Sequence, residues 1–281
     1  MTIQRLALAA ALALYAVPAL AAGGAAGADT AAPPDSRLEV TMNLYAGGVS
    51  LGKVDLDASV RGSAYHVVSH LETEGVLNTF WKANIQATSS GSIGPKSVVP
   101  ALYDSFTIRH DGQKQQVSLT YANNAPRLFA EPAYDLTSYS IKPEDQKNTF
   151  DPLSAVMTIL TGAAATGGDG CNLTAPIFDG RRRYNIEMTK VRDVDNIKLS
   201  NGLYQGKGML CQLHYKQIAG YKPTVLRAKD PYPVFNAWMA PFKSGSREYL
   251  VPLKVWADTS FGPVTAVATS LKLDGVAPKS S

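Results

Sequence analysis

The sequence predicts a mainly β protein: a curved antiparallel sheet or an open β-barrel, with one short helix packed against it. Three observations support this prediction. Apolar and polar residues alternate over many segments, as in strands with one buried face. Glycine, proline, asparagine and aspartate separate these segments, as expected of turns. A single segment instead repeats its apolar residues at helical spacing.

The clearest strand pattern is a predicted hairpin near the start of the domain. Even positions are apolar from Leu38 to Leu44, and the pattern resumes after two glycines from Val54 to Val60. Trp81, Ala83, Ile85 and Ala87 alternate with polar residues in the same way. Further strands are predicted at 64–73, 102–110, 115–121, 183–191, 203–217, 247–258 and 262–273. The proline-rich, aromatic stretch 219–245 is expected to be irregular, and either covers an open sheet edge or rims a ligand cavity.

The predicted helix begins after Asp151, which is a favourable N-cap residue, and has Pro152 at its first position. Four apolar residues share one face of it, which predicts packing against the sheet; these are Leu153, Val156, Met157 and Leu160. Gly162 is expected to end the helix.

The N-terminus resembles a secretory signal. Arg5 is followed by an apolar run from residue 6 to 20 and by small residues suited to cleavage, which predicts a signal peptide at 1–21. The run is too short for a membrane-spanning helix, which needs about 20 apolar residues. Residues 22–36 have the composition of a flexible leader. We expect the remainder, 37–275, to form a single β-rich domain with no transmembrane span.

Charge argues against nucleic acid as a partner. Without Arg5 the chain has 26 basic and 23 acidic residues, a net charge of +3, which is too weak for a nucleic-acid footprint. The densest basic cluster is 181–183, directly after the predicted turn at 178–180. We interpret this cluster as the solvent-exposed end of a hairpin. The alternative is that it contacts lipid phosphates.

The two cysteines, Cys171 and Cys211, favour a structural disulfide in an exported protein. The alternatives are two reactive thiols or half of a metal site. His214 lies three residues after Cys211, but on a strand this spacing places the two side chains on opposite faces. A disulfide is therefore the preferred interpretation.

Catalytic motifs are missing from the sequence, which contains no nucleophile elbow, zinc-protease helix, phosphate-binding loop or dinucleotide fingerprint. His66 and His70 share a strand face but lie about 13 Å apart on an extended strand, too far for one metal. Asp55 and Asp57 lie on the polar face of their strand and read as solvated. We therefore expect no enzymatic activity, no catalytic or metal site and no cofactor.

Four segments together resemble an uncharacterised bacterial envelope family, domain of unknown function 3108. They are FDPLSA at 150–155, IFDGRRRY at 177–184, VWAD at 255–258 and GPVTAV at 262–267. The resemblance implies a curved, open β-barrel around a helix, similar to the carriers that move lipoproteins across the periplasm. It implies a periplasmic location in a Gram-negative envelope and no established enzymatic role.

Two functional hypotheses are favoured over a third, an unrecognised hydrolase whose catalytic groups the fold would assemble from distant segments. In the first, the protein is a non-enzymatic periplasmic binder or carrier of a lipid or acyl chain in an apolar concavity. The candidate lining residues are Met42, Leu44, Val54, Leu56, Trp81, Ile85 and Met157. In the second, it is a structural or protein-interaction factor for envelope integrity, without a ligand cavity and with an envelope protein as its partner.

Overall fold

The computed structural model describes residues 35–74, 83–109, 112–136, 141–166, 170–222, 232–259 and 262–278. The predicted signal peptide and nearly all of the predicted leader lie outside these ranges. Within them no helix is long and apolar enough to cross a membrane.

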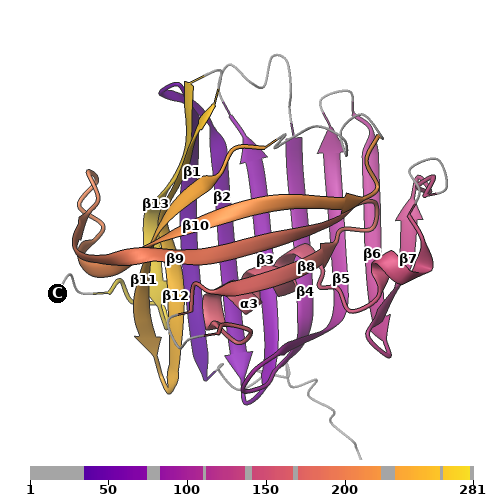
Figure 1. The fold of residues 1–281 in the computed structure, drawn as a ribbon, viewed down its shortest axis with the longest axis horizontal. Helices are drawn as coiled ribbons and strands as arrows, with labels where there is room; N and C mark the ends of the chain where they lie inside the picture. The colour runs from indigo at the N-terminus through magenta and orange to yellow at the C-terminus, as the bar shows by residue number, and fades with distance from the viewer. Residues whose placement is uncertain are drawn as a thin grey trace, which may run out of the picture. The chain divides into compact units, whose positions relative to one another are not determined.

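Thirteen strands form one antiparallel sheet in the order β7-β6-β5-β4-β3-β2-β1-β13-β12-β11-β10-β9-β8 (Figure 1). Their bounds are β1 Ser36–Ala46, β2 Val49–Arg61, β3 Ala64–Thr73, β4 Ala83–Ile93, β5 Val98–Arg109, β6 Lys114–Ala122, β7 Ala125–Glu131, β8 Leu173–Phe178, β9 Arg183–Lys198, β10 Gln205–Ala219, β11 Phe235–Ser244, β12 Arg247–Thr259 and β13 Gly262–Leu273. The helices are α2 Pro143–Gln146 and α3 Pro152–Thr161.

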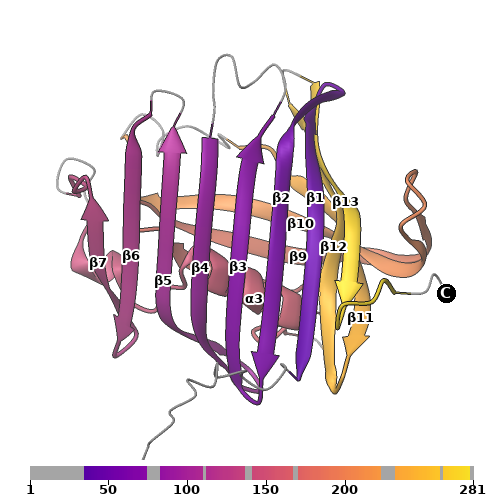
Figure 2. The same ribbon diagram turned by 180° about the vertical axis from the view of Figure 1, so that it is seen from behind.

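The sheet curves so strongly that its two ends face each other. Strands β8, β9 and β10 cross one face of β3 to β6, and α3 lies between the two layers (Figures 1 and 2). The helix contacts β3, β4 and β5 on one side and β8 and β12 on the other. This arrangement confirms the predicted fold class, an open β-barrel with a helix packed against the sheet. We call the face of the sheet that is turned toward α3 the inner face.

Helix α3 is fixed at both ends by its own sequence. The Asp151 carboxylate accepts hydrogen bonds from the backbone N–H groups of Leu153 and Ser154, at 3.0 and 2.9 Å. Gly162 ends the helix at φ 62°, a left-handed conformation that favours glycine. Leu153, Met157 and Leu160 are buried, as the helical stripe predicts.

The predicted first hairpin is confirmed with the expected faces. Leu38 lies opposite Ala58, and Met42 lies opposite Val54. The expectation of an irregular stretch at 219–245 is wrong in part, because β11 occupies 235–244 and pairs with β10 and β12. A register shift at Trp238/Met239 breaks its alternation, which hides the strand from a period-two pattern.

Strands β7 and β8 were not predicted. Each is short and contains a proline, Pro126 in β7 and Pro176 in β8, and proline weakens a strand signal. Both strands lie at the ends of the sheet, where a missing backbone N–H is tolerated. The Pro176 carbonyl accepts a hydrogen bond from the Phe150 N–H at 2.7 Å, which ties β8 to the segment before α3.

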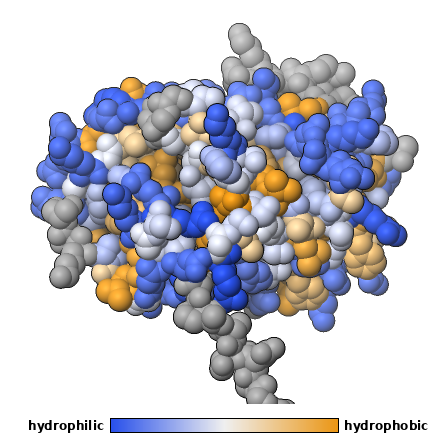
Figure 3. All heavy atoms as spheres, turned by 90° about the horizontal axis from the view of Figure 1, so that it is seen from below, coloured by the Kyte–Doolittle hydropathy of each residue, from blue (hydrophilic) through white to orange (hydrophobic). Residues whose placement is uncertain are grey.

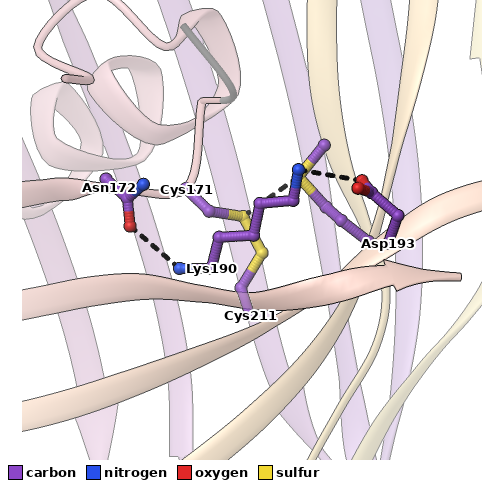
Figure 4. The surroundings of a disulfide bond; sticks show 6 residues. Cys171, Asn172, Lys190, Asp193 and Cys211 are labelled. Atoms are coloured by element: carbon purple, nitrogen blue, oxygen red, sulfur yellow. Dashed lines mark hydrogen bonds and ion pairs between the residues drawn. A yellow bond between two sulfur atoms is a disulfide. The ribbon is translucent and has the colours of Figure 1, made fainter. Parts of the chain in front are cut away.

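A disulfide joins Cys171, just after the α3 loop, to Cys211 in β10 (Figure 4). Their Cα atoms are 6.1 Å apart, inside the usual range for a disulfide, and both side chains are fully buried. Beside it, the Lys190 N–H donates to the Asn172 side-chain oxygen at 3.0 Å, and the Lys190 ammonium lies 2.9 Å from Asp193 (Figure 4). This pairing agrees with the sequence expectation and anchors the layer that covers α3.

Candidate functional site

The inner face of β1 to β6 is fully buried at one end of its strands, the covered end, and has partly exposed side chains nearer the other. The covered end contains a cross-strand row in which every side chain is buried. That row consists of Leu38, Ala58, Val67, Ser89, Tyr103 and Leu119. Because α3 lies across β3, β4 and β5 (Figure 1), its width of about 10 Å covers only part of strands that are 9 to 13 residues long.

A second row crosses the same face nearer the other end of the strands, and all of its side chains remain partly exposed. We call it the open row. Its members, in order across β1 to β6, are Met42, Val54, Leu71, Ile85, Thr107 and Gln115. The row between them, which includes Val40 and Leu56, is mixed: Val40 is buried and Leu56 is partly exposed. Exposure therefore rises from the covered row to the open row, but Gly52 and Thr73, which pair in the next row beyond it, are buried again.

The predicted lining residues have three outcomes: they are partly exposed on the inner face, buried in the core, or outside the described residues. Met42, Val54 and Ile85 lie in the open row, and Leu44 and Leu56 lie beside it on the same face, all partly exposed. Trp81 lies outside the described residues.

Met157 differs from these residues. It lies in α3, is 0% exposed and belongs to the main core cluster with Leu153 and Leu160. Met157 therefore packs the covered end, away from the open row.

Sequence analysis missed Leu71, which lies at the centre of the open row opposite both Val54 and Ile85. The alternation in the predicted strand 64–73 contained the signal, since Tyr65, Val67 and Leu71 are on one face. It also missed the polar end of the row, where Thr107 pairs with Gln115. The open row thus changes from apolar to polar between β4 and β5.

At this polar end lies a hollow of about 370 Å³. Thr107 and Gln115 of the open row line it together with Gln113, Lys114, Pro132, Tyr134 and Arg181. The Gln115 side-chain nitrogen donates to the Pro132 carbonyl at 2.9 Å, which fixes one wall. The lining residues include Lys114 and Arg181, but Lys114 pairs with Ile108, so its side chain lies on the outer face of the sheet.

The turn between β8 and β9 supplies Arg181. Asp179 accepts hydrogen bonds from the N–H groups of Arg181 and Arg182, at 2.9 and 2.6 Å, which closes the turn. Gly180 packs onto the inner face of β6 and β7: a Cβ atom there would lie 2.7 Å from Val117 Cγ1 and 3.1 Å from Leu128 Cδ1. The glycine therefore allows the turn to approach β6 closely and holds Arg181 at the hollow.

Buried polar groups gather most densely at the start of α3. The Tyr65 and Ser154 hydroxyls are 2.6 Å apart, and the Ser89 hydroxyl lies 3.2 Å from Asp151. Ser154 also donates to Asp151. Burial raises the pKa of the Asp151 carboxyl above its ordinary value, and burial likewise raises the pKa of Tyr65 to about 12. Ser154 and Asp151 are 0% exposed, so this network holds the helix and offers no surface for a substrate.

The polar residues singled out on the strands lie on the opposite, outer face. Asp57 forms an ion pair with Arg37, and Asp55 accepts a hydrogen bond from Thr41 at 2.7 Å. His70 lies 3.2 Å from the Asn84 side-chain oxygen.

His66 is exposed, as is His214. His110 falls outside the described residues. Over the ranges that the structure describes, no three His, Cys, Asp or Glu side chains gather as a metal site would require.

The end of the domain opposite the open row has a mixed surface. Viewed from below, polar and apolar side chains are interspersed over it (Figure 3). The inner apolar side chains at that end, such as Leu38, Val60 and Tyr65, are buried under α3 and its surroundings.

The fold and the site define a β-barrel-like domain whose concave face is filled by a helix at one end and has a row of partly exposed side chains nearer the other. The chain belongs to the family of proteins of unknown function DUF3108, whose model matches residues 39–269. No curated protein sequence matches it.

A solved structure shows the same kind of fold. A β-barrel-like protein of the domain of unknown function DUF1849 from Brucella abortus superposes with a TM-score of 0.52 and 8% identity, over 85% of this chain and 98% of that one. The structure of MucB in complex with MucA(peri) gives a TM-score of 0.11 and 11% identity over 86% and 90% of the two chains, a score too low to support any inference.

Proposed function

We propose that this protein is a non-enzymatic, periplasmic protein of the bacterial envelope that binds a lipid or acyl chain along the open row of its inner face. The observation that carries the proposal is the contrast between the two rows. At the covered end, Leu38, Ala58 and Val67 are completely buried, whereas Val54, Leu71 and Ile85 on the same face are partly exposed.

Exposed apolar side chains on a concave surface favour an apolar ligand, because their burial releases about 25 cal/mol per Å². Neighbouring strands are about 4.8 Å apart, so the four apolar positions from β1 to β4 extend for about 14 Å. A chain of methylene groups laid across these strands would contact each in turn. The predicted signal peptide at 1–21 supports an envelope location for such a ligand.

We propose no enzymatic role, because the buried polar side chains that gather at the start of α3 serve to fix that helix. Asp151 and Ser154 cap α3 and are shielded from solvent, so they support the helix that fills the covered end. The paired carboxylates, Asp55 and Asp57, are engaged with Thr41 and Arg37 on the outer face.

Native mass spectrometry of protein purified from its own envelope, followed by solvent extraction, tests the proposal. We expect a stoichiometric bound mass that is removed by extraction and identified as a lipid. Bare protein, combined with no uptake of lipid from a membrane extract after delipidation, would overturn the proposal.

The second candidate function is that of a protein-interaction factor, and the exposed edge strand β7 favours this function. Among the described strands it pairs with β6 alone and ends the sheet, and the Phe129 side chain on it is 53% exposed. Exposed sheet edges can accept a further strand from a partner. Bare protein that co-purifies with one defined envelope protein would support this function instead.

A further inference from the structure

Strand β7 forms one end of the sheet (Figure 2). Among the described strands it pairs with β6 alone, so its other side is a free edge. The two strands are joined by a two-residue turn of Asn123 and Asn124, whose φ angles of 51° and 60° are those of a type I′ hairpin. In such a hairpin the residues next to the turn exchange backbone hydrogen bonds, and every second pair beyond them does the same.

This alternation fixes which backbone groups of β7 face the free edge. The residues next to the turn, Ala122 and Ala125, form the first bonded pair, so every second residue of β7 bonds to β6. These residues are Arg127, Phe129 and Glu131. The residues between them, Leu128 and Ala130, direct their N–H and C=O groups to the free edge, where no described residue hydrogen-bonds to them. Pro126 faces the same way, so its missing N–H costs no bond to β6.

The outer side chains of β7 have a charge pattern that complements itself. Arg127, Phe129 and Glu131 lie on the outer face at two-residue spacing, and all three are exposed. Neither Arg127 nor Glu131 has an ion-pair partner among the described residues. If two copies of β7 run antiparallel with their Phe129 residues opposite each other, Arg127 of each copy lies opposite Glu131 of the other. Both charges are then paired across the strands, and the two exposed rings meet.

The backbone groups fit the same register. Because Phe129 bonds to β6, its pair with the second copy is a non-bonded one. The neighbouring pairs are then bonded, so Leu128 of one copy and Ala130 of the other exchange hydrogen bonds, and the two-fold axis repeats this pair. Pro126 and Pro132 flank this segment and have no N–H to donate, which confines the ladder to residues 127–131.

Charge selects this arrangement over the alternatives. Charges and prolines on an edge strand usually prevent pairing. If two copies paired parallel and in register, Arg127 would lie beside Arg127 and Glu131 beside Glu131, and like charges destabilise such pairs. An antiparallel slip of two residues would place Phe129 opposite a charged side chain. The antiparallel pairing centred on Phe129 instead neutralises both charges.

We propose that β7 is a dimerisation edge, at which two copies of this protein pair antiparallel through residues 127–131 about a two-fold axis at Phe129. The two sheets become one continuous sheet across this axis. A second copy is the matching partner because the complementary pattern lies in β7 itself. Strand β7 contributes no residue to the open row, so dimerisation is independent of the proposed lipid binding.

Sedimentation velocity of the full-length mature protein from about 1 to 500 µM tests the proposal, because so short an interface should dissociate at about 1–100 µM. Two variants reverse one charge each, Arg127→Glu and Glu131→Arg. Each change turns both attractive pairs of the dimer into repulsive ones. The matched control is Lys96→Glu, in the exposed turn between β4 and β5. Urea midpoints establish that each variant folds.

We expect the wild type and Lys96→Glu to dimerise with rising concentration, and each β7 variant to weaken dimerisation at least about tenfold. An equimolar mixture of the two β7 variants should restore the dimer, since the acidic strand of one then faces the basic strand of the other. Raising the salt concentration should weaken the wild-type dimer.

The remaining results overturn the inference. A wild type that stays monomeric over the whole concentration range would show that β7 does not pair with itself, and would leave the proposed lipid function intact. Dimerisation that neither β7 variant affects would place the interface elsewhere. Loss of the dimer in both variants without recovery in the mixture would mean that the two charges act within one chain.

Discussion

Ile85 of β4 lies directly opposite Thr107 of β5, and this pair marks the point where the open row changes from apolar to polar. On the β1 side of the pair the row consists of Met42, Val54 and Leu71, and on the other side it ends in Gln115. The same pair joins the apolar part of the open row to the hollow that Thr107 and Gln115 line.

The centre of the open row should control binding of an apolar chain. Leu71→Asn puts an amide where the ligand would contact two neighbouring strands, and an unpaired amide in a buried contact costs about 1–3 kcal/mol. We expect affinity for monoolein to fall at least about tenfold, measured by calorimetry. Val68→Asn changes an exposed residue on the outer face of the same strand and should leave affinity unchanged. Equal losses in both variants would show that the site lies elsewhere.

Replacing Met157 by alanine should destabilise the folded protein more than replacing Ile85 by alanine. Met157 is 0% exposed in the core, so Met157→Ala should lower the free energy of unfolding by about 2–5 kcal/mol. Ile85 is partly exposed, and Ile85→Ala should cost about 1 kcal/mol in the delipidated protein. Urea denaturation gives both values. Similar costs for the two variants would indicate that the open row is as tightly packed as the core.

The disulfide should contribute to the stability of the layer that covers α3. Cys171 and Cys211 are 40 residues apart in sequence and fully buried, so the bond constrains a long loop of the unfolded chain. Replacing both by alanine should lower the free energy of unfolding by about 2–4 kcal/mol. Thiol labelling of the denatured, unreduced wild-type protein should detect no free thiol. Two labelled thiols per chain would refute the bond.

Tyr65 should make stability depend on alkaline pH. Burial raises its folded-state pKa from 10.0 to about 12, so between these values the folded protein retains a proton that the unfolded chain loses. The stabilisation from Tyr65 is therefore complete below pH 10 and is lost as the pH rises to about 12, a change of about 2–3 kcal/mol.

The test compares urea unfolding of the wild type and Tyr65→Phe across this pH range. The variant lacks the hydrogen bond to Ser154, so it should be about 1 kcal/mol less stable at neutral pH. Its stability should also fall less steeply above pH 10. Parallel pH profiles would mean that Tyr65 does not titrate with unfolding.

The amino-acid pattern was sufficient to predict the faces of most strands and the position of α3. Leu38 and Ala58 could be placed on one face because a strand alternates its side chains, and Asp151 and Gly162 mark the helix ends by local chemistry. The signals for these strand faces and helix ends come from residues that are close together in the sequence. The shift at Trp238/Met239 and the prolines of β7 and β8 interrupt those local patterns, which is why these strands were missed.

The site was less predictable because it depends on contacts between distant segments. Alternation places Ile85 and Ala58 on the inner face, but it does not reveal which end of the strands α3 covers. Met157 was assigned to the ligand cavity for the same reason, since a core stripe and a cavity wall have the same composition. Arg181 reaches the hollow because Gly180 packs against Val117, a contact that spans more than half of the sheet.

Photolabelling with an acyl chain that carries a diazirine tests the central claim most directly. The delipidated protein is irradiated with the probe, digested, and the labelled residues are mapped by mass spectrometry. We expect labels on inner-face residues of β2, β3 and β4, above all Val54, Leu71 and Ile85, and we expect unlabelled lipid to reduce this labelling. Labels confined to outer-face residues such as Val68 and Phe106, or labelling that unlabelled lipid does not reduce, would contradict it.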